Sequence, residues 1–125
     1  MDKDYVIQVV NTIKKQLLTT TSVYVVGSWG VSNFIVTIYK NMPALQFSVN
    51  GRLFQGNVII ALNGSDYYEV YLQNSSESKC INNEVDCSEL VDVIDRAIEC
   101  GTDKEEYEQF CEQYQVNWIF YILNK

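Results

Sequence analysis

Residues 44–72 read ALQFSVNGRLFQGNVIIALNGSDYYEVYL, and this stretch decides the fold. Apolar and polar side chains alternate from Leu45 to Val49, which is the pattern of a strand with one buried face. The pairs Asn50-Gly51 and Asn63-Gly64 signal tight turns, because both central residues of such a turn need positive φ. The stretch therefore predicts an antiparallel meander that reverses direction at these two pairs.

The neighbouring segments extend this meander to three to five strands. Val23–Val26 is predicted as a short strand, and Phe34–Tyr39 is a stretch of β-branched and aromatic residues. The strand that follows Asn50-Gly51 runs toward Leu62, and Gly56 within it indicates a bulge. In Tyr67–Leu72 the side chains alternate between a buried and an exposed face, and the polar stretch after it, Asn74–Asn83, is expected to be a loop.

Helices are predicted on both sides of the meander. Asp4–Leu18 has apolar residues at spacings of three and four, as in an amphipathic helix. Asp86-Cys87-Ser88-Glu89 has the pattern of a capped helix start, and this helix is expected to end near Cys100. A further helix is expected from Thr102. Residues 116–123 either extend this helix or form a strand, and their β-branched and aromatic side chains favour the strand. The prediction is one α+β domain, residues 1–125, with both acidic helices packed on one face of the sheet.

The charge of the chain is concentrated near its C-terminal end. Twelve of the sixteen acidic residues lie between Glu77 and Glu112, against three basic residues, while the chain as a whole carries −7. Such a field repels nucleic acid and anionic membranes and attracts basic protein surfaces. We therefore expect a partner-binding surface made of the outward acids of the two helices together with Trp29, namely Glu89, Asp92, Asp95, Glu99, Glu105, Glu106, Glu108, Glu112 and Trp29.

Each part of this expected surface has a plainer alternative. An acidic helix face can serve solubility alone, since charged surfaces are common in proteins of this size. Trp29, between Gly27 and Gly30, can equally be a core residue whose flanking glycines permit a turn. The acidic faces nevertheless remain the best functional candidate in the sequence.

Catalysis is not expected, because the chain contains no histidine. This removes the commonest general base, the Ser-His-Asp and Cys-His arrangements and the usual metal ligand. The carboxylate pairs Asp66/Glu69 and Asp92/Asp95 are candidates by spacing only, and Cys87 at a helix start lies between acids that oppose a thiolate. We therefore predict no enzyme activity, no catalytic residue, no cofactor and no metal.

The four cysteines are predicted to be thiols. No Cys-x-x-Cys pair is present, which disfavours a zinc site, and the first residues lack the basic and apolar parts of a signal peptide, which disfavours disulfides. Cys111 and Cys100 are expected to face the core. No apolar run is long enough to span a membrane, so the predicted location is cytoplasmic.

Several short motifs together resemble those of a family of small uncharacterised proteins from gut bacteria and their mobile elements. The motifs lie between Gly27 and Glu99: Gly27-Ser28-Trp29-Gly30, Met42-Pro43-Ala44-Leu45, Ala61-Leu62-Asn63, Tyr68-Glu69-Val70-Tyr71, and Glu84-Val85-Asp86-Cys87-Ser88-Glu89-Leu90 followed by Ile94-Asp95. The family has no assigned activity, so the resemblance implies no role for any residue. It implies a context in which small acidic proteins of mobile elements inhibit nucleic-acid-handling machinery, including CRISPR nucleases.

These observations predict a non-catalytic acidic binding protein. The expected partner is a basic protein surface, such as that of a nuclease, and the role is that of an inhibitor or regulator, of anti-CRISPR type in the narrowest reading. One alternative is an enzyme or small-molecule binder with a tyrosine-lined pocket between sheet and helices. Another is an oligomerisation module in which Trp118–Leu123 adds to the sheet edge of a neighbour.

Overall fold

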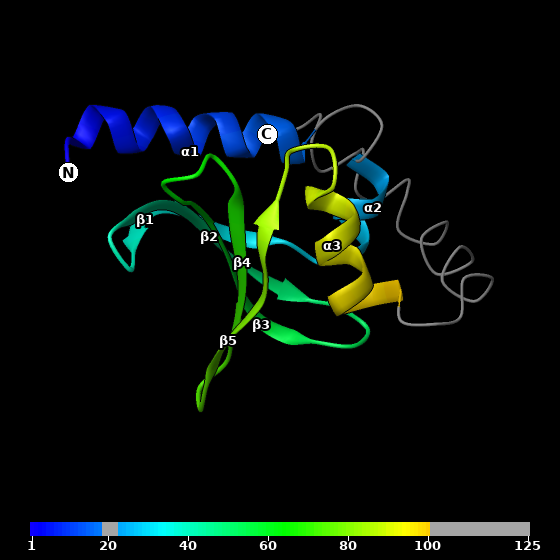
Figure 1. Cartoon of the computed structure of the whole chain (residues 1–125). Helices are drawn as coiled ribbons and strands as arrows, with labels where there is room; N and C mark the ends of the chain where they lie inside the picture. The colour runs from blue at the N-terminus through cyan, green and yellow to red at the C-terminus, as the bar shows by residue number, and fades with distance from the viewer. Residues whose placement is uncertain (19–22, 101–125) are drawn as a thin grey trace.

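A computed structural model describes residues 1–18 and 23–100 of the chain, as an α+β fold (Figure 1). Five strands form one antiparallel sheet in the order β1-β2-β3-β4-β5, which confirms the predicted meander. Helix α1 precedes the sheet and helix α3 follows it. The elements are α1 (Lys3–Leu17), α2 (Val23–Ser28), β1 (Ser32–Tyr39), β2 (Met42–Asn50), β3 (Gln55–Leu62), β4 (Tyr68–Gln73), β5 (Ser78–Val85), α3 (Leu90–Asp95) and the π-helical turn η1 (Arg96–Cys100).

Helix α1 lies within one residue of its predicted bounds. Asp2 caps its first turn, where the side-chain Oδ1 accepts a hydrogen bond from the backbone N–H of Asp4. Lys14 and Lys15 in the last turn complement the negative end of the helix dipole. Four of the six apolar residues that set the predicted periodicity are buried, and Val9 and Leu18 are only partly buried. The buried residues are Val6, Val10, Ile13 and Leu17.

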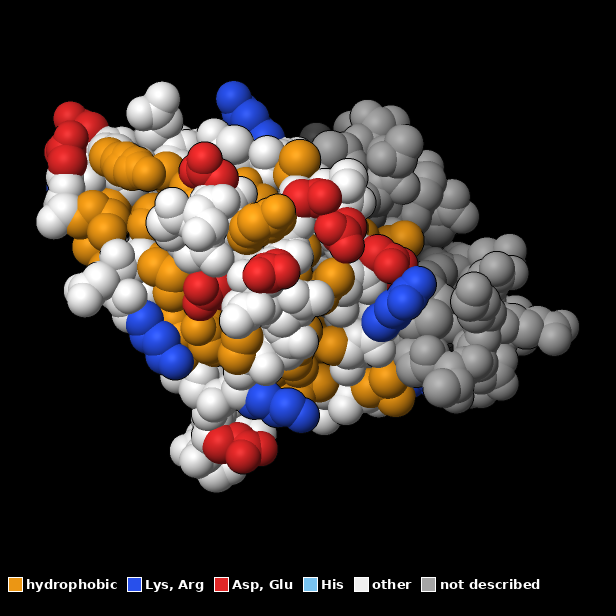
Figure 2. Space-filling view, in the orientation of Figure 1, with side chains coloured by type: hydrophobic (Ala, Val, Ile, Leu, Met, Phe, Trp, Pro, Cys, Tyr) orange, Lys and Arg blue, Asp and Glu red, His pale blue; other side chains and the backbone are white. Residues whose placement is uncertain are grey.

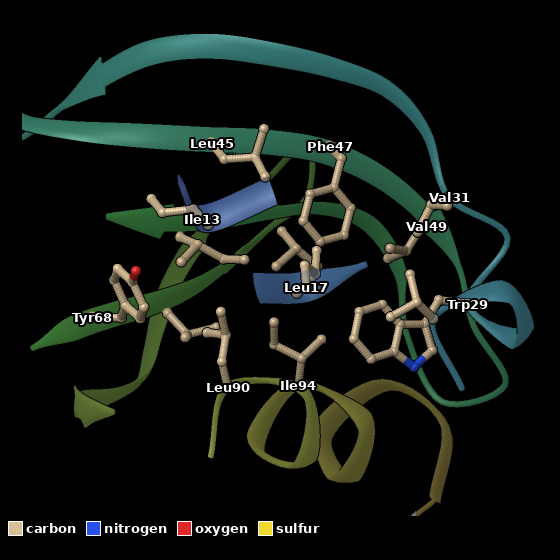
Figure 3. Packing of buried hydrophobic residues seen from close by; sticks show 14 of the residues in the cluster. Ile13, Leu17, Trp29, Val31, Leu45, Phe47, Val49, Tyr68, Leu90 and Ile94 are labelled. Carbon is tan, nitrogen blue, oxygen red and sulfur yellow. The ribbon is translucent and has the colours of Figure 1, made fainter. Parts of the chain in front are cut away.

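The main core lies between one face of the sheet and the helices (Figure 3). Leu45 and Phe47 point from β2 toward Leu90 and Ile94 of α3, with side chains of α1 between them. Leu45 and Phe47 are at most 1 % exposed, as their alternation with polar residues predicts. A smaller cluster lies on the opposite face of the sheet, where Tyr39 and Met42 pack against Ala44, Ile59, Ala61 and Tyr71.

The segment from Val23 is a helix, so its prediction as a strand is wrong. β-Branched residues favour strands only weakly, and tertiary packing overrides the preference. Here the short helix α2 buries Val26 and delivers Trp29 to the core, and the hydroxyl of Ser28 donates a 2.6 Å hydrogen bond to the carbonyl of Val25. Gly30 then takes a positive φ of 63°, which allows the chain to turn into β1.

The prediction of a loop over Asn74–Asn83 is wrong for most of this segment, because strand β5 begins at Ser78. β5 is an edge strand, and its side chains are exposed on both faces except at Ile81 and Val85. Periodicity cannot reveal such a strand, since backbone pairing with β4 and not side-chain burial holds it.

The chain reverses at both predicted Asn-Gly pairs, although neither forms a two-residue turn. β2 and β3 are joined by the four residues 51–54, and neither Asn50 nor Gly51 has positive φ. The two-residue turn of this sheet lies instead at Lys40-Asn41, with φ values of 49° and 64° and the pair Tyr39 and Met42 beside it.

The bulge predicted at Gly56 is also wrong, because β2 and β3 stay in regular register through the pair Val49 and Gly56. Glycine is required there for a different reason. Its φ is 152°, and a Cβ at this position would come within 2.6 Å of the backbone oxygen of Gln73. The predicted helix from Thr102 and the strand within residues 116–123 lie outside the described residues.

Candidate functional site

Four exposed acidic side chains lie close together in sequence where β5 leads into α3. Glu84, Asp86, Glu89 and Asp92, here called the acidic band, are all exposed within nine residues of sequence. Figure 2 shows acidic side chains spread over the face that carries β4, β5 and α3. The hydroxyl and the backbone N–H of Ser88 both bond to Oδ1 of Asp86, and these hydrogen bonds lower the pKa of that carboxyl. Asp86 is therefore charged at neutral pH.

A basic residue reduces the charge at one end of the acidic band. Nε of Arg96 lies 3.2 Å from a carboxylate oxygen of Asp92, one helical turn away, and both side chains are about two-thirds exposed. An exposed pair of this kind adds little stability, typically about 0.3–0.5 kcal/mol. Its main effect is to lower the negative potential near Asp92.

Asp95 does not face solvent, so the sequence-based placement of this residue is wrong. It is 7 % exposed, and its Oδ1 accepts a hydrogen bond of 2.9 Å from the indole Nε1 of Trp29. A buried indole N–H needs an acceptor, and Asp95 supplies one. The second expected partner-binding residue, Trp29, is itself 0 % exposed and stacks against Phe47, so a role as an exposed anchor is wrong as well.

Glu99 is likewise buried, at 0 % exposure, and does not belong to an outward acidic face. Its Oε1 accepts a hydrogen bond of 3.1 Å from the backbone N–H of Arg52. The Nε of Arg52 in turn donates to the backbone oxygen of Glu99 at 3.0 Å, and Leu53 N–H donates to the oxygen of Ile98 at 2.8 Å. These three bonds attach the β2–β3 loop to η1.

Burial raises the pKa of Glu99 from 4.5 to about 7. The negative charge of Asp95 adds to this rise, while the hydrogen bond and the charge of Arg52 oppose it. Among the described residues no group bonds to the second oxygen, Oε2. A large fraction of the Glu99 carboxyl is therefore uncharged at neutral pH, and its contribution to an electrostatic surface is small.

Helical spacing failed at Asp95 because this residue turns inward within α3 to bond with Trp29, and it failed at Glu99 because that residue lies in the π-helical turn. The prediction put Glu89, Asp92, Asp95 and Glu99 on one face of an α-helix, but the exposed line is Glu89, Asp92 and Arg96. From Arg96 the chain winds as a wider π-turn, which shifts every later side chain around the axis. The one sequence signal for an inward acid was a tryptophan in need of an acceptor. The predicted site residues Glu105, Glu106, Glu108 and Glu112 lie outside the described residues.

The described tyrosines do not line a common pocket between sheet and helices. Tyr68 alone is part of the main core, while Tyr5 and Tyr67 are exposed. Tyr39 and Tyr71 meet on the opposite face of the sheet, with ring centroids 4.8 Å apart and Nζ of Lys40 4.8 Å from the Tyr71 ring. The space between sheet and helices is filled by packed apolar side chains (Figure 3).

Tyr71 is a structural residue in this cluster. Its hydroxyl donates a 2.7 Å hydrogen bond to Glu69, and Tyr39 shares one of 2.6 Å with Ser78 of β5. Burial, followed by the bond to Glu69, raises the pKa of Tyr71 well above its ordinary value of 10. The phenol therefore stays protonated, which suits a hydrogen-bond donor.

In each of the two candidate catalytic pairs, Asp66/Glu69 and Asp92/Asp95, the two carboxylates lie in different environments. Glu69 is bonded to Tyr71 and to the amide of Asn63, while Asp66 lies in an exposed turn with a φ of 63°. Asp92 bonds to Arg96, and Asp95 turns inward to Trp29.

Cys80 and Cys87 are exposed free thiols, as predicted. The side chain of Cys100 and the whole of Cys111 lie outside the described part of the chain.

No known protein family, curated protein or solved structure matches this chain. The resemblance to proteins of mobile elements therefore stays a prediction from short motifs. None of the helices within residues 1–18 and 23–100 is long and apolar enough to cross a membrane.

Proposed function

We propose that this chain is a non-catalytic binding protein that engages a basic protein surface through the acidic band. The observation that carries the proposal is the placement of Glu84, Asp86, Glu89 and Asp92, which are all exposed and lie within nine residues of sequence. Complementary charge of this kind steers association and fixes orientation more than it adds affinity. The absence of histidine from the chain supports the non-catalytic part.

The proposed surface is smaller than the predicted one. It no longer includes Asp95, Glu99 and Trp29, because these three residues are buried. The contribution of the acids within residues 105–112 to this surface stays a prediction. We further propose that the partner normally binds nucleic acid and that this chain inhibits it, in the narrowest case as an anti-CRISPR protein. These narrower proposals rest on the charge pattern and the motif resemblance. A small-molecule pocket is less favoured, because the described tyrosines point to three different parts of the surface and core.

The proposal is tested by binding to purified nucleases with basic grooves, including an RNA-guided nuclease, at increasing NaCl concentration. The test variant combines Glu84→Gln, Glu89→Gln and Asp92→Asn. The control combines Asp4→Asn, Asp66→Asn and Glu77→Gln, which removes the same number of exposed charges elsewhere. We expect the test variant to bind about tenfold more weakly and the control to lose less.

Salt supplies the second arm of this test. Contact between opposite exposed charges weakens as the ionic strength rises, because counterions screen it. Binding that is unchanged between low and high salt, or equal losses in the two variants, would show that the acidic band does not carry recognition.

A further inference from the structure

Strand β1 forms one edge of the sheet, and its chemistry is unlike that of an ordinary edge. Within the described part of the chain it pairs only with β2, so the backbone groups along its other side have no strand partner there. Its eight residues, SNFIVTIY, include no charged side chain. Natural proteins usually place charges, prolines or bulges on such strands, because unpaired edges recruit other strands.

Half-exposed apolar side chains flank this edge on both faces. Val36 pairs with Leu45 and so shares the helix-covered face with Ile38, whereas Ile35 pairs with Gln46 on the opposite face. Ile35, Val36 and Ile38 are 47 %, 48 % and 50 % exposed. A strand added to this edge would cover all three side chains.

The opposite edge of the sheet, β5, has the protection that β1 lacks. It contains Lys79 and Glu84, both exposed, and its pairing with β4 is interrupted by two register shifts. In β1 the only irregularity lies between Ser32 and Ile35, before the apolar segment. Residues 35–39 therefore remain a regular and uncharged template for pairing.

The segment Ile-Val-Thr-Ile-Tyr is complementary to itself. In an antiparallel pair centred on Thr37, Thr37 would lie opposite Thr37 of a second copy, Val36 opposite Ile38, and Ile35 opposite Tyr39. Pairs of β-branched residues, β-branched with aromatic residues, and threonine with threonine are all favourable across strands. We propose that residues 35–39 of β1 pair in this register with a second copy of the chain, which joins the two sheets across a two-fold axis.

Charges outside the segment set the salt dependence of this association. Each chain carries a net charge of −7, so two copies repel each other. Added salt should strengthen the dimer because it screens this repulsion. This is opposite to the salt effect expected for the acidic band, so the two proposals can fail independently.

Sedimentation or light scattering from micromolar to millimolar concentration tests the association. We expect the mass to rise from 14.4 kDa toward twice that value, and to do so at lower concentration in high salt. Val36→Lys and Ile38→Lys place a charge on half-exposed edge positions and should each abolish the rise. Asn82→Lys on exposed β5 is the matched control and should dimerise as the wild type does. A wild type that stays at 14.4 kDa throughout, or a Val36→Lys variant that associates normally, would overturn the proposal.

Oxidative crosslinking tests the register and depends on no charged variant. Directly opposite residues in an antiparallel pair have Cα atoms about 4.5–5.5 Å apart, within reach of a disulfide. Thr37→Cys should therefore give a covalent dimer under mild oxidation, above the background from the exposed Cys80 and Cys87. Ile35→Cys should not, because the two copies of residue 35 would be separated by four positions along the strand, about 13 Å. Equal crosslinking of both variants, or crosslinking of Ile35→Cys alone, would rule out the register.

Discussion

The indole Nε1 of Trp29 donates a hydrogen bond of 2.9 Å to Oδ1 of Asp95, across 66 positions of sequence. This contact joins the end of α2 to the end of α3 inside the core. It removes Trp29 and Asp95 together from the surface where both were expected. A single buried bond thus changes the interpretation of two candidate binding residues.

Loss of the acceptor for Trp29 should destabilise the protein. We expect Asp95→Ala to lower the free energy of unfolding by about 2 kcal/mol, because the buried indole N–H would lose its partner. Asp95→Asn retains an oxygen acceptor and should lose clearly less. Urea denaturation monitored by tryptophan fluorescence measures both, and equal losses in the two variants would contradict the assigned role of this bond.

Glu99 should make stability depend on pH in an unusual direction. Its pKa is raised from 4.5 to about 7 in the folded chain, so between these values the folded state binds more protons than the unfolded state. The free energy of unfolding should then fall as pH rises through this window, by at most about 1.4 kcal/mol per pH unit, and level off above it. Denaturation between pH 4.5 and 8 measures this slope.

Substitution isolates the contribution of Glu99 from that of other carboxyls. Glu99→Gln keeps an acceptor for the N–H of Arg52 and cannot ionise, so the fall between pH 4.5 and 7 should shrink. Asp92→Asn, at an exposed position, should leave the fall in place. A slope that survives Glu99→Gln unchanged would assign it to another group.

Gly51 should not tolerate any side chain. A Cβ there would lie 2.6 Å from the backbone oxygen of Ile98 and 3.1 Å from that of Phe54, so the loop would separate from η1. We expect Gly51→Ala to cost about 1–3 kcal/mol, as overpacking does. Gly64→Ala is the control, since no atom lies within 4 Å of its Cβ position. Thermal unfolding of the two variants should differ, and matching melting temperatures would show that the contact is not constraining.

The turn at Lys40-Asn41 should depend on the residue at its second position. Asn41 has a φ of 64°, a conformation that asparagine and glycine tolerate and β-branched residues do not. Asn41→Val should cost about 1–2 kcal/mol, while Asn41→Gly should be close to neutral. Chemical denaturation checks the ranking, and a valine variant as stable as the glycine variant would contradict the turn geometry.

Periodicity predicted most of the fold because the apolar residues with strand or helix spacing form the main core. Leu45, Phe47 and Val49 alternate along β2, and all three are 5 % exposed or less. Val6, Val10, Ile13 and Leu17 recur at helical spacing and are equally buried. β5 and α2 were missed for opposite reasons. The side chains of β5 are too polar to show an alternating pattern of burial. Helix α2 is only six residues long and rich in β-branched residues, which favour a strand, so only tertiary packing makes it helical.

The candidate site was predicted less well than the fold. Glu89 and Asp92 are exposed as expected, whereas Asp95 and Glu99 are buried. Helical spacing assumes one buried face and a constant 3.6 residues per turn; the first assumption fails at Asp95 and the second from Arg96 onward. The Trp29 indole and the β2–β3 loop provide bonding partners for these inward acids, and neither is adjacent in sequence.

The sequence by itself determined the fold class, the order of the meander and the concentration of acids between Glu77 and Glu112, because local patterns of burial, turns and charge depend on neighbouring residues. Only the tertiary structure decided which acids remain charged and exposed. That outcome depends on hydrogen-bond donors from distant segments, such as Trp29 and Arg52, which offset part of the cost of removing a carboxyl from water.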